Sequence, residues 1–188
     1  MRKEVVIIGK GGQGILLAGH LLSDAIAKNT KYHVINMAFY SAETRGTESR
    51  TEIVITDNEE EADYFMARRP DIAVFMHPEY ISKYVKNIKE STIVLVDSSF
   101  NVILTGISPE IKIHKIPFTL IAEQKLGTSR VANVVMLGYL LALTNIIDLE
   151  SLKKSIKENV KEQWIEINIK ALELGYSEGI RRRREIQP

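Results

Sequence analysis

Six apolar runs alternate with helix-like segments over the first two thirds of the chain. Their hydrophobicity is mostly continuous rather than alternating, which favours strands of a sheet that is covered on both faces. The runs span residues 4–8, 32–37, 50–56, 71–75, 92–97 and 111–116. Helical segments follow the first run, over 14–28, and the fourth, over 78–88. This alternation predicts an α/β fold with three layers, α/β/α, around a mainly parallel, Rossmann-like sheet.

The chain from residue 119 onward has a helical pattern instead. A long apolar helix begins at Ser129 and runs over 131–146, and Gly138 within it indicates close packing. Asp148 is the expected N-cap of a second helix, and a third helix carries Trp164. We expect these C-terminal helices, from about residue 129, to pack on the same sheet, so that 1–188 is a single domain.

A glycine-rich turn joins the first predicted strand to the first helix. It consists of Gly9, Lys10, Gly11, Gly12, Gln13 and Gly14. Glycine suits positions with positive φ and positions where the backbone approaches a ligand or another chain closely. The first N–H groups of the following helix have no partner within that helix, which suits the turn to binding an anion.

The spacing of Gly9, Gly11 and Gly14 fits the G-x-G-x-x-G pattern of dinucleotide sites. A Rossmann NAD site also needs an acidic residue about twenty positions further on, at the end of the second strand. The second run ends at Met37 without one, and the first acid after it is Glu43. The sequence therefore argues against an ordinary NAD site, and a free-standing nucleotide-binding protein stays as the alternative function.

A polar loop with a central glycine, residues 39–50, follows the second run. Ligands and partners gather at the carboxyl ends of strands in open α/β sheets, so we expect this loop near the glycine turn. In one interpretation Glu43 and Arg45, braced by Gly46, contact a cofactor, a phosphate or a partner. In the other, the loop is solvated and holds a local ion pair of little energetic value. The residues alone favour neither.

Composition excludes several classes of chemistry. The chain has no cysteine, which excludes disulfides, thiolate zinc sites, iron–sulfur ligation and cysteine nucleophiles. Its formal net charge of +1 gives no indication of nucleic-acid binding. No run approaches the roughly 18 apolar residues of a membrane span, and no apolar signal segment precedes the first strand. We expect a cytoplasmic protein that binds neither nucleic acid nor membrane.

Three motifs together carry a resemblance to a known family. They are G-x-G-G-Q-G-[IV] before a helix rich in leucine and alanine, then a tyrosine and small residues leading to E-x-R-G-G, then P-F-T with R-V-A-N. They stand here at 9–18, at Tyr40, Glu43, Arg45 and Gly46, and at 117–119 with 130–133. Because the three motifs occur in this order, the chain resembles the gamma subunit, or gamma domain, of 2-oxoacid:ferredoxin oxidoreductases over nearly its whole length. The second motif departs from the family at Ser41 and Ala42, usually glycine and proline, and at Thr47, usually glycine.

The resemblance implies a role in a complex of the pyruvate, 2-oxoglutarate or ketoisovalerate type. Such a complex oxidatively decarboxylates a 2-oxo acid with coenzyme A, giving acyl-CoA, CO2 and reduced ferredoxin. Thiamine diphosphate with Mg sits between alpha and beta chains, and the [4Fe-4S] clusters belong to partners such as a ferredoxin-like delta chain. This chain lacks a thiamine-diphosphate motif, so we expect it to bind no cofactor alone, to hold neither catalytic residue nor metal, and to be inactive in isolation.

The implied task of this chain is to complete the complex. The glycine turn and residues 40–46 would pack against partner subunits and lie near coenzyme A. The beta chain of indolepyruvate oxidoreductase, which has a similar first motif, is a further alternative. Its second loop reads as a methionine, alanine, glutamine, arginine run, whereas residues 42–45 here read Ala-Glu-Thr-Arg, which favours the 2-oxoacid gamma group. The particular 2-oxo acid stays open.

The remaining candidate residues have structural interpretations. We interpret His77, at the sheet end where sites gather, as a loop histidine rather than a ligand. Asn133 interrupts an apolar helix and is expected to bond a neighbouring loop or subunit, because an unpaired buried amide costs free energy. The basic run 181–184 is expected to be a solvated, frayed end. Three histidines assemble no metal motif and are taken as structural: His20, His33 and His114.

Overall fold

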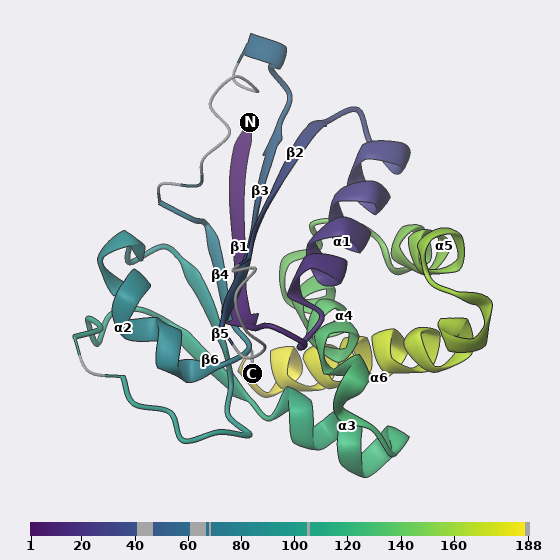
Figure 1. The fold of residues 1–188 in the computed structure, drawn as a ribbon. Helices are drawn as coiled ribbons and strands as arrows, with labels where there is room; N and C mark the ends of the chain where they lie inside the picture. The colour runs from purple at the N-terminus through teal and green to yellow at the C-terminus, as the bar shows by residue number, and fades with distance from the viewer. Residues whose placement is uncertain (41–46, 61–66, 68, 105, 187–188) are drawn as a thin grey trace.

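A mixed six-stranded sheet forms the middle layer of the protein (Figure 1). The computed structural model describes residues 1–40, 47–60, 67, 69–104 and 106–186. The strands are β1 (Arg2–Lys10), β2 (His33–Tyr40), β3 (Glu48–Thr56), β4 (Ile72–Phe75), β5 (Ile93–Asp97) and β6 (Ile113–Ile116), in the spatial order β2-β3-β1-β4-β5-β6. β1, β4, β5 and β6 pair in parallel, whereas β3 runs antiparallel to both β1 and β2.

The central strand β1 explains why the apolar runs are continuous. Its side chains alternate between two cores: Val5 and Ile7 pack on one side of the sheet, Val6 and Ile8 on the other. Both faces of the strand are covered, so neither face calls for polar residues. β2 differs from this expectation, because it is an edge strand whose residues are only exposed or half-buried. It also runs on to Tyr40, three residues beyond the predicted end.

Helices of unequal bulk cover the two faces (Figure 1). One face carries the large helices α1 (Ile15–Asn29), α3 (Phe118–Leu126), α4 (Ala132–Thr144), α5 (Leu149–Asn159) and α6 (Glu162–Ile186), with η4 (Ser129–Val131) leading into α4. The other face carries the short segments η2 (Pro78–Tyr80), α2 (Ile81–Tyr84) and η3 (Val85–Asn87). The α/β class and the three layers are confirmed, and the predicted helix over 78–88 is broken into these three short pieces.

Helix α4 is buried all round. Every residue from 132 to 142 is buried, because the helix lies between the sheet and α6. It ends at Thr144, two residues before the predicted end, where Asn145 takes the left-handed conformation (φ 49°). A helix that is apolar on every side has no face suited to water, so it needs a cover on every side.

The cover on the outer side of α4 is α6, and the two backbones touch. A Cβ on Gly138 would overlap the carbonyl oxygen of Leu172, and one on Gly175 would overlap the carbonyl oxygen of Val135. Only glycine leaves room for this approach. The close packing expected at Gly138 is confirmed.

The basic run near the end of the chain differs from the expectation of a frayed end. α6 continues helically through it to Ile186. Arg182 donates to the carbonyl oxygen of Lys115 in β6, and Arg183 donates to that of Ala142 in α4, each at 3.5 Å. The long arginine side chains cover neighbouring backbone while the helix stays at the surface.

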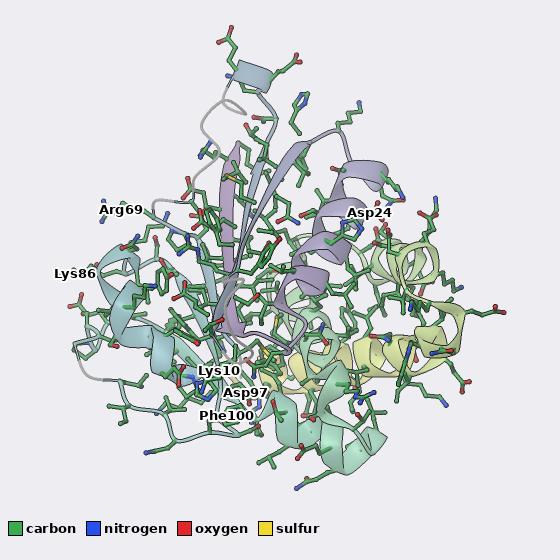
Figure 2. The ribbon with its side chains drawn as sticks, viewed as in Figure 1. Lys10, Asp24, Arg69, Lys86, Asp97 and Phe100 are labelled. Atoms are coloured by element: carbon green, nitrogen blue, oxygen red, sulfur yellow. The ribbon has the colours of Figure 1, made fainter. Side chains whose placement is uncertain are left out.

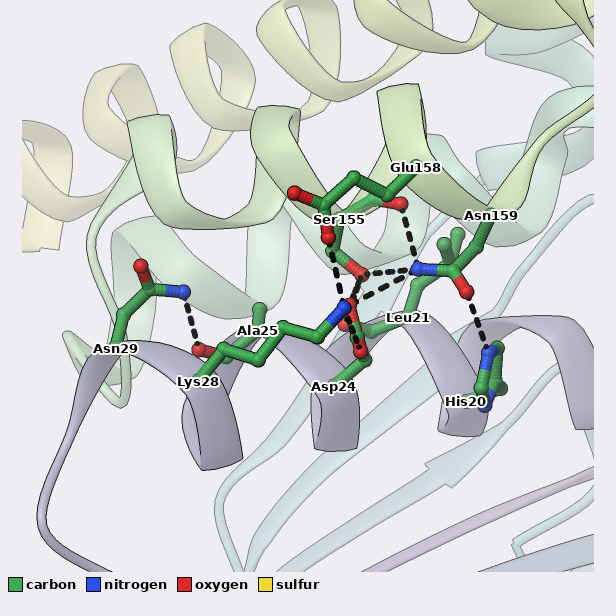
Figure 3. Close-up of polar contacts among 9 residues, drawn as sticks. All are labelled: His20, Leu21, Asp24, Ala25, Lys28, Asn29, Ser155, Glu158 and Asn159. Carbon is green, nitrogen blue, oxygen red and sulfur yellow. Dashed lines mark hydrogen bonds and ion pairs between the residues drawn. The ribbon is translucent and has the colours of Figure 1, made fainter.

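A polar network ties α5 to α1 (Figure 3). The Asp24 carboxylate accepts hydrogen bonds from Ser155 Oγ at 2.7 Å and Asn159 Nδ2 at 2.9 Å, and it pairs with Lys28 Nζ at 2.8 Å. Lys28 also pairs with Glu158 at 2.7 Å. Burial raises the pKa of the Asp24 carboxyl, but these bonds outweigh burial and bring the net pKa below its ordinary value.

We predict that Gly175→Ala lowers the free energy of unfolding by about 1–3 kcal/mol, because the new methyl overpacks the contact with α4. This loss exceeds the roughly 1 kcal/mol that alanine gains over glycine in helix propensity. Urea unfolding followed by circular dichroism measures the change. Ser177→Ala, at an exposed position of the same helix, is the control and should change stability by less than about 0.5 kcal/mol. A Gly175→Ala protein that is more stable than the original contradicts the close contact.

A second prediction concerns acid stability. The pKa of Asp24 is depressed in the folded state, so its stabilisation is present above its unfolded pKa of about 3.9 and is lost as the pH falls through the folded value. Asp24→Asn should therefore cost about 1–2 kcal/mol at pH 7 and less at pH 2. Unfolding titrations at both pH values test this. Glu166→Gln, which removes a carboxylate from an exposed pair with Lys170, should leave stability nearly unchanged at both.

Candidate functional site

The glycine turn is held at the carboxyl end of β1 by the side chain of Gln13. Gln13 Oε1 accepts a hydrogen bond from the backbone N–H of Lys10 at 2.7 Å, and Gln13 Nε2 donates to the carbonyl oxygen of Met76 at 3.1 Å. Met76 directly follows β4, so the glutamine links the ends of two neighbouring parallel strands. Gly12 (φ 98°) and Gly14 (φ 71°) adopt the positive φ that the sequence led us to expect.

Helix α1 begins at this turn without a side-chain cap. Its N-cap is Gly14, and its first turn contains no acidic residue. The first turn of α1 therefore supplies no carboxylate to the leading N–H groups or to the positive end of the helix dipole. Such an end favours a negatively charged group from elsewhere.

Asn133, from the buried helix α4, fixes the start of α1. Its Nδ2 donates to the carbonyl oxygen of Gly14 at 2.9 Å, and a Cβ on Gly14 would overlap this amide. The expected bond from Asn133 to a neighbouring loop is confirmed. The side chain is 2% exposed, and its Oδ1 has no hydrogen-bond partner among the described residues. The Oδ1 atom of Asn133 is thus a hydrogen-bond acceptor for a donor that is not among the described residues.

The second motif flanks the glycine turn. The backbone N–H of Gly11 donates to the carbonyl oxygen of Thr47 at 2.7 Å, and Ser49 in β3 is opposite both Gly9 in β1 and Tyr40 in β2. Tyr40 is 70% exposed. The Thr47 end of the loop therefore contacts the turn, as expected, whereas Tyr40 is separated from it by β3. The loop residues proposed as contacts lie outside the described part of the chain: Ser41, Glu43, Arg45 and Gly46.

The third motif ends at the same edge of the sheet. Asp97, at the end of β5, is fully buried, and its carboxylate accepts from the Thr119 backbone N–H at 3.1 Å and from Thr119 Oγ1 at 2.5 Å. Thr119 belongs to the Pro-Phe-Thr motif and lies in the first turn of α3. Together with Asn133, this contact brings all three motifs to one edge, although more than 100 residues separate the first from the last.

His77 also lies at this edge. Its ring packs on Phe100 with centroids 4.7 Å apart, and its Nδ1 lies 3.4 Å from Glu79 Oε2, which pairs with Lys10 Nζ at 2.9 Å. Burial, followed by the positive charge of Lys10, lowers the pKa of His77 below its ordinary value. Figure 2 shows Lys10, Asp97 and Phe100 gathered at the same end of the sheet. The histidine is accordingly uncharged at neutral pH and packs as an aromatic side chain.

The sheet order removes the geometry that an ordinary NAD site requires. In a Rossmann site the second strand lies next to the first, and an acid at its end meets the ribose. Here β3 separates β2 from β1. Among the paired strand residues, the acidic residue nearest the turn is Glu48, which lies opposite Lys10. Its carboxylate accepts hydrogen bonds from Lys83 Nζ at 2.6 Å and from the Tyr84 hydroxyl.

Sequence reasoning did not identify the cluster of side chains around Arg50 in β3. The Arg50 guanidinium lies 4.2 Å from the ring centroid of Phe39, donates to the Tyr84 hydroxyl and pairs through Nε with Glu52 at 2.9 Å. Glu52 in turn accepts from the backbone N–H of Ala67 at 3.0 Å. The cluster holds β2, β3 and α2 together. Glu48, Arg50 and Glu52 are spaced two residues apart, which places them on one face of a strand. This spacing is the feature of the sequence that could have indicated the cluster.

The described residues contain no group of three or more His, Asp or Glu side chains that could hold a metal ion. Of the other histidines, His20 bonds Asn159 at 2.9 Å, and His114 packs near Tyr139. Within the same described residues, no helix is both long and apolar enough to cross a membrane.

Comparisons with known proteins place these motifs in a family. The sequence profile of pyruvate ferredoxin/flavodoxin oxidoreductases matches residues 4–178. The 2-oxoglutarate synthase subunit KorC of Methanocaldococcus jannaschii is 40% identical over 178 residues, covering 94% of this chain and 93% of KorC. The ketoisovalerate oxidoreductase subunit VorA of Methanothermobacter thermautotrophicus is 32% identical over 92% of this chain, which corresponds to 35% of VorA.

The fold is shared with a solved gamma subunit. A keto/oxoacid ferredoxin oxidoreductase gamma subunit from Geobacter sulfurreducens superposes with a TM-score of 0.80 at 27% identity, covering 96% of this chain and 98% of the other. The indolepyruvate oxidoreductase subunit IorB of Archaeoglobus fulgidus is only 24% identical, so the indolepyruvate alternative is the weaker one. The chain therefore belongs to the pyruvate ferredoxin/flavodoxin oxidoreductase family, as one of its gamma-type chains.

Proposed function

We propose that this chain is the gamma subunit of a cytoplasmic 2-oxoglutarate:ferredoxin oxidoreductase. The complex would decarboxylate 2-oxoglutarate oxidatively with coenzyme A, release succinyl-CoA and CO2, and pass two electrons to ferredoxin. The observation that carries the proposal is the convergence of three distant motifs at one sheet edge, in a chain 40% identical to a 2-oxoglutarate synthase subunit over nearly its full length.

The electron carriers and the decarboxylating cofactor are assigned to partner chains. The chain has no cysteine with which to ligate an iron–sulfur cluster. We propose alpha and beta subunits that hold thiamine diphosphate with Mg, and a ferredoxin-like delta subunit that holds [4Fe-4S] clusters. The gamma chain then contributes binding and positioning, and no step of bond making is assigned to its residues.

Coenzyme A is the ligand proposed for the glycine turn. The uncapped start of α1 offers backbone N–H groups to a phosphate, and Gly11 and Gly12 are exposed. Asn133 holds the carbonyl oxygen of Gly14, so it fixes the direction of these N–H groups. Arg45, with a fork of donors that matches a phosphate, is the side chain proposed to complete the site, together with Tyr40, Ser41, Glu43 and Gly46 of the same loop. In this arrangement the chain binds and orients the coenzyme.

The complex and its substrate are tested first. We expect an affinity-tagged chain, purified anaerobically from its native cells, to recover stoichiometric thiamine-diphosphate and iron–sulfur subunits. The recovered complex should reduce ferredoxin with 2-oxoglutarate at a higher kcat/KM than with pyruvate, and the isolated chain should be inactive. Recovery of a lone chain that carries a nucleotide would contradict the subunit role. Recovery of the complex with a preference for pyruvate would contradict only the substrate.

The coenzyme A site is tested by Arg45→Ala in the assembled complex. Loss of a charged hydrogen bond to phosphate should raise the KM for coenzyme A about tenfold or more while the KM for 2-oxoglutarate is unchanged. Arg69→Ala is the matched control, because Arg69 is exposed and lies away from the glycine turn (Figure 2). An unchanged KM for coenzyme A in an assembled Arg45→Ala complex counts against the contact.

A further inference from the structure

Strand β2 is the edge strand at one end of the sheet. It is eight residues long and pairs residue for residue with β3, from His33 opposite Thr56 to Tyr40 opposite Ser49, without a bulge. Within the part of the chain that the structure describes, no strand pairs with its outer side. Every second residue of such an edge points its N–H and C=O groups outward, ready to pair with another strand.

The opposite edge of the sheet is protected, and this edge is not. β6 is only four residues long, and its sequence includes Lys115, whose carbonyl oxygen is covered by Arg182. β2 reads HVINMAFY and contains no lysine, arginine, aspartate, glutamate or proline. Charges, prolines, bulges and short length are the devices that keep edge strands from pairing, and β2 has none of them.

The helix above this edge also offers an uncharged flank. Gly19 of α1 faces Thr51 on the sheet, and the charged residues of α1 face α5 (Figure 3). By helical periodicity, Leu16, Ser23 and Ala27 share the remaining flank, above β2, with His20 at its border, where it bonds Asn159 of α5. Ser23 is 8% exposed, and its Oγ has no hydrogen-bond partner among the described residues. The open edge thus continues into a surface without charge.

We propose that β2 pairs antiparallel with β2 of a second copy of this chain, which joins the two sheets across a two-fold axis. The axis stands perpendicular to the sheet, so opposite residues must share a face. The faces are set by Asn36, which accepts from Thr51 on the α1 side at 2.5 Å, and by Phe39, which lies beneath Arg50 on the other side. An even-numbered residue of one β2 therefore lies opposite an even-numbered residue of the other, and an odd-numbered residue opposite an odd-numbered one.

The pairing that suits these side chains is centred on Met37. Met37 then meets its own copy, Ile35 meets Phe39 and Val34 meets Tyr40, which places apolar side chains opposite apolar ones. The next register that keeps the faces is centred on Asn36. It sets His33 opposite Phe39 and leaves Tyr40, 70% exposed, without an opposite residue.

A second copy fits this edge better than a foreign strand. Partner chains select one another through complementary charges, and β2 carries no charged side chain with which to choose. In a two-fold pair, each copy meets the outward donors and acceptors of the other with an identical set. The proposal rests on β2 alone, so its failure would leave the proposed enzymatic role intact.

A single cysteine reports the register, because the full chain contains no other thiol. In Met37→Cys the two thiols meet at the axis, so mild oxidation should give a disulfide-linked dimer in high yield on a non-reducing gel. Ile103→Cys, at a loop position that is 67% exposed, is the control and should stay mostly monomeric. Equal cross-linking of the two variants overturns the proposal. In the purified complex, cross-linking of Met37→Cys to a different subunit would also overturn it.

A charged substitution in β2 tests whether this edge forms the dimer. Light scattering on the unmodified chain should give the mass of a dimer at micromolar concentration, and Ala38→Lys should shift it to the monomer mass. Ala38 is exposed in the single copy, so the fold should survive, with an unchanged circular dichroism spectrum. Ile103→Lys should remain dimeric. A monomeric unmodified chain, or an Ala38→Lys protein that stays dimeric, overturns the pairing.

Discussion

The burial of α4 is the constraint on which the rest of the structure depends. This helix is apolar on every side and lies between the sheet and α6, and the contact of Gly138 and Gly175 lets the two backbones touch. Two helices whose backbones touch cannot shift toward each other without steric overlap, so this contact fixes the position of α4. Because α4 also carries Asn133, the same packing decides where the glycine turn and the start of α1 are held.

The candidate site is built mostly from backbone, and its support comes from side chains far away in the sequence. Gln13 fastens the turn to the end of β4, Asn133 fastens it to α4, and Asp97 fastens the Pro-Phe-Thr segment to β5. Each of these side chains satisfies buried backbone groups that would otherwise be unpaired. The arrangement suits the proposed role, in which this chain would place N–H groups for an anion and cofactors on partner chains would supply the chemistry.

The two edges of the sheet have different characters, and the difference follows from what lies next to each. β6 is short and is capped by an arginine from α6, whereas β2 is long, regular and uncharged. β2 ends at Tyr40, opposite Ser49 of β3, and Ser49 is in turn opposite Gly9 at the start of the glycine turn. A partner strand on this edge would therefore extend the sheet, with β2 and β3 between it and the glycine turn.

The sequence by itself determined the features that depend on neighbouring residues. Strand and helix alternation, the positive φ at Gly12 and Gly14, the cap at Asp148 and the motifs of the family were all readable, because each is a property of a few consecutive positions. The structure alone decided the order of the strands. An apolar run has no direction, so nothing in residues 50–56 showed that β3 would run antiparallel between β1 and β2 and exclude the ribose position of an NAD site. The Arg50 cluster, the contact between α4 and α6 and the open edge of β2 are likewise products of pairing between distant segments, which no local pattern records.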